Sequence, residues 1–337
     1  MADTNSQDAI AVIGAGSWGT ALAMHIAASG RACYLWGHET DHQLEMQATH
    51  SNERFLPGIR FPDPLNIILS LDDLPYNTDA FLIVVPSHAF RDVLRRLHEH
   101  DELHPRVIAW GTKGLELGTC NLMSDIADSE LPDQVQRVVI SGPSFAGEVA
   151  RGMPTAVSVA SRTSAAANEV ASWLHHDNFR AYTLEDVTGV QLGGALKNVM
   201  AIAAGISDGL GFGANARAAL ITRGLAEISR LASHVGGNME TFMGLAGLGD
   251  LVLTCTDDQS RNRRCGLGLG AGKSLDAVVK EIGQEVEGIQ SAAAAWELSR
   301  RHNVSMPITE QVHKVLYEGL PARDAVQNLL HREQKHE

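Results

Sequence analysis

Ala9-Ile-Ala-Val-Ile-Gly14-Ala-Gly16-Ser-Trp-Gly19-Thr-Ala-Leu-Ala23 is the stretch that predicts the fold. It begins with an apolar run long enough for a strand that is buried on both faces. Glycines with the spacing G-x-G-x-x-G follow, and then a segment of good helix formers. Gly14 permits a tight turn, Gly16 lets the backbone approach a pyrophosphate, and Gly19 lets the helix pack closely on the strand. The stretch therefore predicts a dinucleotide site with phosphates at the helix N-terminus, against the alternative of a merely structural glycine turn.

Length and charge restrict the classes of protein that need to be considered. The chain has 337 residues, 44% of them hydrophobic and 20% charged, which suggests two domains of an ordinary globular protein. Its net charge of −13 argues against nucleic acid and against an anionic membrane surface as partners. The polar, acidic residues 1–8 do not resemble a signal or transit peptide. No apolar run approaches the ~20 residues that cross a bilayer, so we expect no integral membrane segment.

The cysteines indicate a reducing compartment. The chain has four, Cys33, Cys120, Cys255 and Cys265, with no C-x-x-C pair and no framework spacing. Reduced thiols in a cytoplasmic protein are the simplest explanation.

Apolar runs along the first half of the chain predict strands with helices between several of them. Strands are expected at 31–36, 66–70, 80–85, 107–110, 138–141 and 155–160, and helices at 88–98 and 164–175. This alternation predicts a doubly wound, mostly parallel sheet. Ligands of such sheets bind beyond the carboxyl ends of the strands, where small and polar residues gather around Lys113.

The second half of the chain has helical patterns only. They cover 187–206, 214–235, 275–282, 287–301 and 306–317, and no Pro/Gly/Ser-rich linker precedes them. We therefore expect an α/β chain with an N-terminal doubly wound Rossmann-type domain over residues 1–187. An all-α C-terminal domain over residues 188–337 would carry substrate and catalytic groups.

The end of the second predicted strand bears on cofactor choice. An Asp or Glu at this place holds the ribose hydroxyls of NAD, whereas the sequence reads Trp36-Gly-His38-Glu39, with the carboxylate late. His38 could face a 2′-phosphate, or it could be a solvent-exposed loop residue. The pattern favours NADPH, or the use of both NADPH and NADH.

Clusters of histidine resemble metal ligands at first sight. His98, His100 and His104 lie in a charged connection with no two-His-plus-carboxylate spacing on one helix face, and His175-His176 is no better placed. A solvated loop explains both, so no metal site is predicted.

Lys197 is the most suspicious single residue. It is the one ionisable side chain between residues 187 and 207, in a helix that is apolar all round. Such a helix is buried, and a buried ammonium needs a partner or a task. Desolvation lowers the pKa of a lysine toward neutrality, which suits general acid–base work. The alternative is a lysine that extends its head to the surface.

Two further polar features accompany Lys197. Asp250, in small and apolar surroundings, could orient and charge-compensate it, or could be a helix N-cap. The segment Ser260-Arg-Asn-Arg-Arg264 is a dense basic patch in an acidic protein. It could be a solvated helix face or an anchor for a substrate phosphate, for which arginine is suited. Together these features predict hydride transfer from a nicotinamide to a small anionic substrate held between the domains, with Lys197 exchanging the proton.

Short motifs follow one another in a specific order along nearly the whole chain. They are Ile13-Gly-Ala-Gly-Ser-Trp-Gly19-Thr-Ala-Leu-Ala, Val84-Val-Pro-Ser-His, Gly111-Thr-Lys-Gly-Leu, Ser141-Gly-Pro-Ser-Phe-Ala-Gly-Glu148, Leu196-Lys-Asn198, Gly247-Leu-Gly-Asp250-Leu, Ser260-Arg-Asn-Arg263 and Val286-Glu-Gly288. The ordered set resembles the bacterial NAD(P)-dependent sn-glycerol-3-phosphate dehydrogenases.

The resemblance implies a reaction and a set of site residues. The reaction is interconversion of glycerone phosphate and sn-glycerol 3-phosphate with NADPH or NADH, which supplies phospholipid synthesis. Lys197 would be the proton donor and acceptor, with Lys113 and Asp250 as further catalytic residues. The implied cofactor residues are Gly14, Gly16, Ser17, Trp18, Gly19, His38, Lys113, Ala146, Arg261 and Glu287. The implied substrate residues are Lys113, Gly142, Ser144, Lys197, Asn198, Asp250, Thr254, Ser260, Arg261 and Asn262.

Alternatives stay open at this point. Another two-domain dehydrogenase with a lysine acid–base, such as a 3-hydroxyacid or 6-phosphogluconate dehydrogenase, would lack the basic patch. A non-catalytic NADPH sensor would have no use for Lys197 and Asp250. The expected partner is a small phosphorylated substrate, and base rates favour a homodimer.

Overall fold

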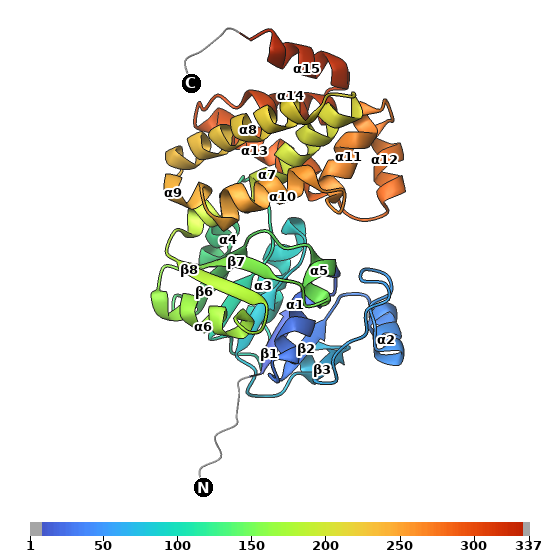
Figure 1. Ribbon diagram of the computed structural model, residues 1–337. Helices are drawn as coiled ribbons and strands as arrows, with labels where there is room; N and C mark the ends of the chain where they lie inside the picture. Colours follow the sequence, from blue (N-terminus) through green and yellow to red (C-terminus); the bar gives the residue numbers. More distant parts are fainter. Residues whose placement is uncertain (1–8, 333–337) are drawn as a thin grey trace. The chain divides into compact units, whose positions relative to one another are not determined.

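The computed structural model describes residues 9–332, which divide into two compact units (Figure 1). Unit 1 is the chain up to Thr112 together with Met123–Val187. Unit 2 is Lys113–Leu122 together with the chain from Thr188 onward. Each unit has an apolar core of its own.

Unit 1 is built on one eight-stranded sheet with the order β3-β2-β1-β4-β5-β6-β7-β8. The strands are β1 (Ile10–Ile13), β2 (Cys33–Trp36), β3 (Leu65–Ile68), β4 (Ala80–Ile83), β5 (Val107–Trp110), β6 (Gln136–Ser141), β7 (Thr155–Ala160) and β8 (Phe179–Leu184). Neighbours are parallel except β6 and β7, which are antiparallel. This confirms the predicted doubly wound, mostly parallel sheet. The strand order reverses between β1 and β4, where such sheets bind dinucleotides.

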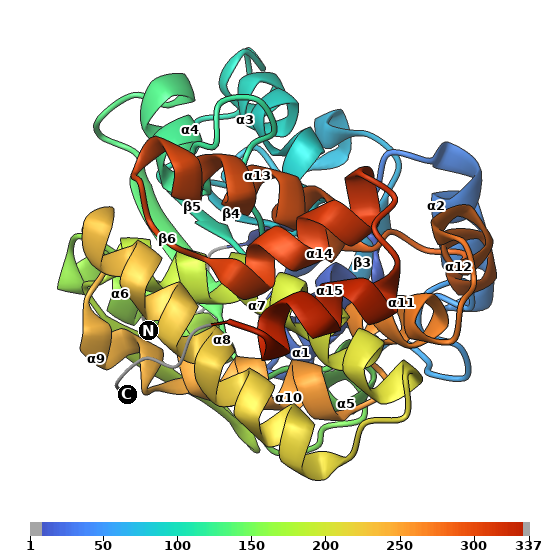
Figure 2. The same ribbon diagram turned by 90° about the horizontal axis from the view of Figure 1, so that it is seen from above.

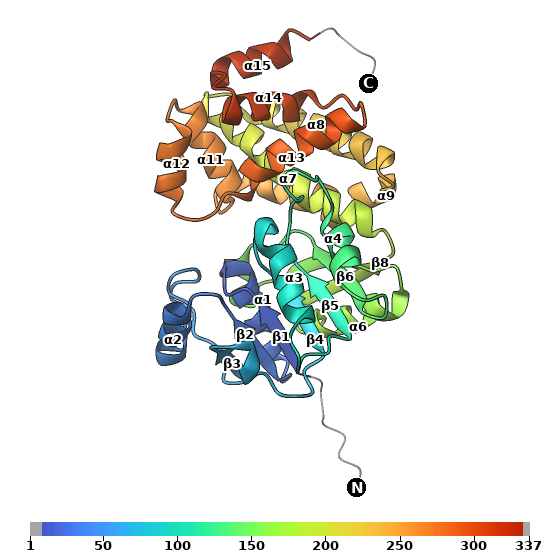
Figure 3. The ribbon, with the colours of Figure 1, turned by 180° about the vertical axis from the view of Figure 1, so that it is seen from behind.

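Helices cover both faces of this sheet. They are α1 (Ser17–Ala28), α2 (Thr40–Thr49), α3 (Phe90–His98), α4 (Met123–Glu130), α5 (Ala146–Ala150) and α6 (Ser164–Leu174). Figures 1 and 3, seen from opposite sides, show α1, α5 and α6 over one face and α3 and α4 over the other. Strands β1, β4 and β5 are buried along their whole length because both faces are covered, which explains their continuous apolar runs.

Unit 2 is helical, as predicted. Its helices are α7 (Val187–Gly209), α8 (Ala214–His234), α9 (Met239–Phe242), α10 (Asp250–Thr256), α11 (Arg261–Gly270), α12 (Leu275–Ile282), α13 (Glu287–Arg301), α14 (Pro307–Tyr317) and α15 (Ala322–Leu330), with one π-helical turn at Leu245–Gly249. Helices α13, α14 and α15 pack in succession, as Figure 2 shows. The segment Lys113–Leu122 is held in this unit because Leu115 and Cys120 enter its core.

Helix α7 is apolar, as predicted, and ends three residues beyond the predicted range 187–206. Its 23 residues include an 18-residue window with a mean hydropathy of 1.2, so by length and composition it could cross a membrane. One such helix is weak evidence for a membrane span, because the core helix of a globular protein passes the same test. All of that window is buried within the protein, as in a core helix.

A buried carboxyl group holds the start of α14. Glu227 on α8 accepts hydrogen bonds from the backbone N–H groups of Ile308 at 2.7 Å and Thr309 at 3.3 Å. Burial raises the pKa of Glu227 to about 7, although the two backbone N–H groups act in the opposite direction. The side chain therefore replaces a local N-cap for this helix.

The structure contains elements that the sequence analysis did not predict. Strand β8 is missing from the predicted set because five of its six residues are only half-buried or exposed at the edge of the sheet, which weakens its apolar signal. Short helices such as α5, α9 and α10 were also not predicted, since fewer than eight residues leave little periodicity to detect.

Candidate active site

The glycine loop of unit 1 has the geometry of a phosphate cradle. Gly14 has φ +122°, and a Cβ atom there would lie 2.3 Å from the carbonyl oxygen of Val84. A Cβ atom on Gly19 would lie 1.9 Å from the carbonyl oxygen of Gly14. A Cβ atom on Gly16, the N-cap of α1, would meet no atom within 4 Å. Packing thus requires Gly14 and Gly19, while the space over Gly16 and the helix N-terminus fits a pyrophosphate.

Trp18 and Ser141, both of unit 1, carry buried polar atoms that have no hydrogen-bond partner among the described residues. The indole Nε1 of Trp18 is buried without a hydrogen-bond partner, and it lies 3.0 Å from the place that a Cβ atom on Gly111 would take. Ser141 Oγ, at the end of β6, is also buried without one. A buried donor normally has a partner, so these atoms fit a site that a bound molecule completes.

The other predicted residues of unit 1 lie at carboxyl ends of strands. Gly142 follows β6, Ser144 Oγ donates to its carbonyl oxygen at 2.9 Å, and Ala146 begins α5. His38 follows β2, with 83% of its side chain exposed. Sequence reasoning missed Arg54, whose Nη1 lies 2.6 Å from Glu39 Oε2 and lowers the pKa of that carboxyl group.

In unit 2 the predicted catalytic residues meet in one cluster. Lys197 on α7 donates from Nζ to Asp250 Oδ1, and Lys113 Nζ donates to Asp250 Oδ2 at 2.8 Å. Asp250 begins α10 and is fully buried, while the side chains of Lys197 and Lys113 are 9% and 17% exposed. Asp250 is therefore a charge partner rather than an N-cap, and the cluster, which we call the Lys–Asp–Lys cluster, carries one net positive charge when all three groups are ionised.

The electrostatics of the cluster favour a lysine that can lose its proton. The pKa of Lys197 is lowered to about 7, mainly by burial and also by the positive charge of Lys113, while Asp250 acts in the opposite direction. Burial by itself raises the pKa of Asp250, but the two ammonium groups outweigh it and bring the net pKa below its usual value. Asp250 thus stays ionised while Lys197 titrates near neutrality.

Two contacts hold the cluster in place. Thr254 Oγ1, one turn along α10, donates to the carbonyl oxygen of Asp250 at 2.6 Å and lies 3.4 Å from its Oδ1. Arg301 holds the segment that carries Lys113 by donating to the carbonyl oxygens of Gly118 at 2.9 Å and Thr119 at 2.5 Å.

A second polar group connects three helices of unit 2. Asn262 Nδ2 donates to Asn198 Oδ1 at 2.9 Å, and Asn262 Oδ1 accepts from the backbone N–H of Gly288 at 2.8 Å. Asn198 and Asn262 are both buried, and Gly288 follows Glu287 at the start of α13. The residue next to Lys197 is thereby tied to the start of α11.

The basic patch at 260–264 separates into residues with different tasks. Ser260 is the N-cap of α11 and accepts from the backbone N–H of Arg263 at 3.2 Å. Arg263 is buried and pairs with Asp208 and Asp258, whereas Arg264 is exposed. Arg261 is half-buried and donates to Gln284 Oε1 at 3.4 Å; burial lowers its pKa, and Glu287 and Glu285 act against that shift. The basic residues of the patch therefore do not act together as a single phosphate anchor. Arg263 is paired with carboxylates, whereas the side-chain partner of Arg261 is the neutral amide of Gln284.

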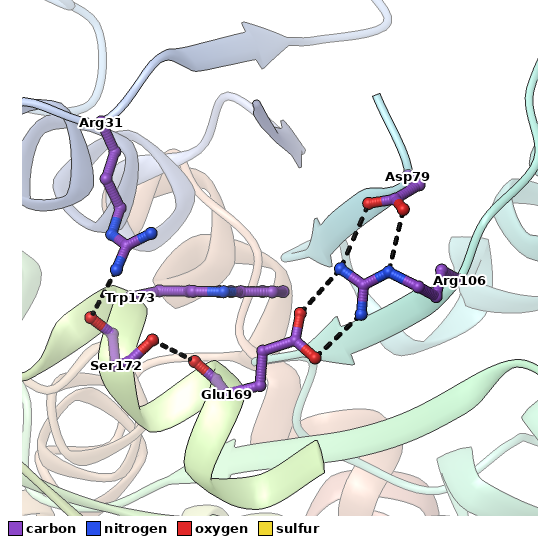
Figure 4. Close-up of a pocket in the computed structure, with 6 residues that line it drawn as sticks. All are labelled: Arg31, Asp79, Arg106, Glu169, Ser172 and Trp173. Carbon is purple, nitrogen blue, oxygen red and sulfur yellow. Dashed lines mark hydrogen bonds and ion pairs between the residues drawn. The ribbon is translucent and has the colours of Figure 1, made fainter. Parts of the chain in front are cut away.

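A cavity of about 380 Å³ at the opposite ends of the strands is charge-balanced (Figure 4). Arg106, just before β5, pairs with Asp79 at 2.8 Å and Glu169 at 2.9 Å, and Arg31 reaches the carbonyl oxygen of Ser172 at 3.4 Å. These groups satisfy one another, and ligands of doubly wound sheets bind at the other edge. We regard this cavity as structural. Within residues 9–332, no group of three or more His, Cys, Asp or Glu side chains could hold a metal ion.

Comparisons with known proteins match both halves of the chain. A model of the N-terminus of NAD-dependent glycerol-3-phosphate dehydrogenase matches residues 9–167, and one of its C-terminus matches residues 186–327. The glycerol-3-phosphate dehydrogenase (NAD(P)+) of Thioalkalivibrio sulfidiphilus is 54% identical over 98% of this chain and 99% of its own. That of Vibrio cholerae is 52% identical over 97% of this chain and 95% of its own.

A solved structure agrees with these matches. The crystal structure of glycerol-3-phosphate dehydrogenase from Coxiella burnetii superposes with a TM-score of 0.92 at 49% identity, covering 96% of this chain and 99% of that chain. The matches confirm the resemblance that the ordered motifs indicated.

Proposed function

Because the chain belongs to the NAD-dependent glycerol-3-phosphate dehydrogenase family, we propose that it interconverts glycerone phosphate and sn-glycerol 3-phosphate, with Lys197 exchanging the proton. The observation that carries the role of Lys197 is the buried Lys–Asp–Lys cluster. Lys197 titrates near neutral pH, which suits a group that must donate a proton in the reducing direction and accept one in the oxidising direction.

The reduction needs one hydride and one proton. When bound, reduced nicotinamide would supply the hydride, and the carbonyl carbon of glycerone phosphate would accept it. As the carbon–oxygen π bond breaks, its electron pair goes to oxygen, which takes a proton from Lys197 Nζ. In the oxidising direction neutral Lys197 removes the hydroxyl proton. Lys197 also stabilises the developing alkoxide before the proton moves.

Asp250 and Lys113 set the protonation state of Lys197. Asp250 holds the Lys197 ammonium in one orientation and balances its charge. Lys113 shares the same carboxylate, so the attraction between Asp250 and Lys197 is divided and the proton leaves more readily. Lys113 also offers a second cation to an anionic substrate or cofactor.

The substrate phosphate is assigned to the start of α11. Arg261, with the donors of Ser260 and Asn262, offers charged and neutral hydrogen bonds at a helix N-terminus. Asn198 and Thr254 complete the substrate residues of unit 2, and Gly142 and Ser144 are those of unit 1. This assignment explains why an acidic protein keeps a half-buried arginine that has no carboxylate hydrogen-bonded to it in the described residues.

The cofactor is assigned to the glycine loop and its neighbours. Gly14, Gly16, Ser17, Trp18 and Gly19 form the loop, while His38, Ala146, Arg261 and Glu287 are the further nucleotide residues and Lys113 is shared with the substrate. The β2 tip supports NADPH, or use of both cofactors, because Arg54 engages the one carboxylate there, Glu39.

Wider features of the protein follow from this function. A cytoplasmic location is supported by four free, buried cysteines. A homodimer rests on base rates. The product glycerol 3-phosphate would supply phospholipid synthesis.

The function is tested by following the loss of reduced-nicotinamide absorbance with purified protein. Glycerone phosphate is compared with unphosphorylated glycerone, and NADPH with NADH. Rapid oxidation with glycerone phosphate alone supports the proposal. Cofactor binding without oxidation would favour a different substrate or a non-catalytic sensor.

A further inference from the structure

Helices α7 and α11 lie side by side in unit 2 with their backbones in direct contact. A Cβ atom on Gly205 of α7 would lie 2.1 Å from the carbonyl oxygen of Arg263, and one on Gly266 of α11 would lie 2.1 Å from that of Ile202. Gly209 and Gly270, one turn further along each helix, meet in the same way. No side chain fits between the helices at these four glycines, so the two backbones approach closely there.

The contacts also fix how the two helices are aligned. The side chain of Asn198 is hydrogen-bonded to that of Asn262, 64 residues later in the chain. One turn along, Gly266 approaches Ile202, and a further turn along, Gly270 approaches Ile206, with the same separation in sequence. The helices therefore run in the same direction in one register. This register places Lys197 level with Arg261, because each directly precedes one of the two paired asparagines.

Ion pairs of Arg263 also stabilise the alignment of α7 and α11. Its guanidinium lies 2.5 Å from Asp208, near the end of α7, and 2.9 Å from Asp258, just before α11. Asp208 is held in turn by Arg217 of α8 at 2.7 Å. The side chain of Arg263 is only 8% exposed, so loss of either carboxylate leaves a buried charge partly unpaired.

We propose that the α7–α11 pair acts as a ruler for the substrate, by which we mean that it fixes the distance between the proton-exchanging group and the phosphate-binding group. Gly205, Gly266 and Arg263 are positioning residues that fix the separation between Lys197 and Arg261. The protein thereby selects substrates in which a phosphate ester lies one fixed chain length from the carbonyl group. The inference rests on the proposed function and names what determines its specificity. A misplacement of about 1 Å is enough to cost roughly 100-fold in rate, so a rigid pair of helices is a strong selector.

The test changes the separation and measures selectivity for substrate length. Gly266→Ala must move α11 away from α7, because the new Cβ atom would collide with backbone. Activity is measured with glycerone phosphate and with its homologue that has one further methylene between carbonyl and phosphate ester. The kcat/KM for glycerone phosphate is expected to fall about tenfold or more. The ratio of the two kcat/KM values is expected to shift about tenfold toward the homologue, with the Kd for NADPH unchanged.

Matched variants separate positioning from general damage. Gly268→Ala, on the same helix, would place its Cβ atom nearest to the side chain of Val278 rather than to the backbone of α7, and it is expected to keep the wild-type ratio. Asp258→Asn removes one of the two ion pairs of Arg263. Because the Asp258 side chain is 70% exposed, this variant should fold, and it keeps the test usable if Gly266→Ala does not fold. It is expected to shift the ratio in the same direction as Gly266→Ala. Arg263→Lys is expected to retain more of the selectivity than Arg263→Gln.

Two outcomes would overturn the ruler. One is an equal loss with both substrates in Gly266→Ala and Asp258→Asn, since that is the effect of lost folded protein. The other is an unchanged ratio in variants whose Tm stays close to that of the wild type. Failure of the wild-type protein to reduce glycerone phosphate would instead refute the proposed function, and the ruler with it.

Discussion

Lys113 Nζ lies 2.8 Å from Asp250 Oδ2, on the same carboxylate whose other oxygen accepts from Lys197. One buried carboxylate therefore serves two lysines. Burial lowers the pKa of Lys197, and the shared carboxylate, a single negative charge beside two ammonium groups, only partly offsets this shift. The chemistry of the site depends on this shared partner as much as on Lys197 itself.

Lys197→Met should abolish turnover while NADPH still binds. Methionine is unbranched like lysine but has no proton to exchange, so we expect kcat to fall by about 100-fold or more. Turnover is followed by absorbance and cofactor binding by fluorescence titration. Wild-type turnover in this variant would remove Lys197 from the mechanism.

The two directions of the reaction should respond oppositely to pH. Reduction needs the Lys197 ammonium and oxidation needs the neutral amine, and the pKa of Lys197 is lowered to about 7. As pH rises through 7, kcat/KM should fall for reduction and rise for oxidation. Lys113→Gln removes a neighbouring positive charge, which should raise the pKa of Lys197. The pH profiles of kcat/KM for both directions should then shift to higher pH. Unchanged pH profiles in this variant would show that Lys113 has no influence on the pKa of Lys197.

Arg261→Ala should weaken binding of the substrate phosphate. A lost charge-assisted contact of this kind costs about 1.5–3 kcal/mol, so KM for glycerone phosphate should rise roughly 10- to 100-fold, with a much smaller effect on the cofactor. The exposed Arg264 is the matched control, and Arg264→Ala should change KM little. Equal effects of Arg261→Ala on substrate and cofactor would show that Arg261 serves the nucleotide as much as the substrate phosphate.

His38→Glu should penalise NADPH relative to NADH. A carboxylate at the tip of β2 would repel a 2′-phosphate and accept hydrogen bonds from ribose hydroxyls. We expect the NADPH/NADH ratio of kcat/KM to fall about tenfold. Arg54→Ala should act in the same direction, because it frees the Glu39 carboxylate that Arg54 now pairs. A ratio that neither variant changes would exclude the β2 tip from cofactor selection.

Glu227 should make stability fall as pH rises. Burial raises its pKa from 4.5 in the unfolded chain to about 7, so the folded protein binds the extra proton between these values. Its contribution is complete below pH 4.5 and is lost as pH rises through 7, a change on the order of 1–3 kcal/mol in the free energy of unfolding.

Comparison of wild type with Glu227→Gln at pH 5 and pH 7.5 isolates this effect. His25 acts in the opposite sense over part of the range, because burial lowers its pKa to about 4, but it is common to both proteins. The wild type should lose more stability than the variant between the two pH values, as measured by thermal unfolding. An equal loss would contradict the assignment.

The sequence predicts those features whose signals are local. The glycine loop and the buried strands are visible because the spacing and the apolar runs lie within about 15 residues. Lys197 is visible because it interrupts an otherwise apolar helix, and the motif around Asp250 suggests its partner. The association of Lys113 with Asp250, 137 residues apart, has no local signal and follows only from the fold. The same holds for Arg263 with Asp208, where the sequence shows an undivided basic patch.

The excursion of Lys113–Leu122 means that neither unit is a continuous piece of chain. The chain passes from one unit to the other after Thr112, again after Leu122 and a third time after Val187. A fragment that ends at Val187 would contain a loop whose apolar residues, Leu115 and Cys120, have lost their core. The complementary fragment would have a carboxylate, Asp250, with one of its two lysines missing. Splitting the protein at its apparent boundary would therefore divide the active-site cluster, and a split or permuted version must keep residues 113–122 with the helical part.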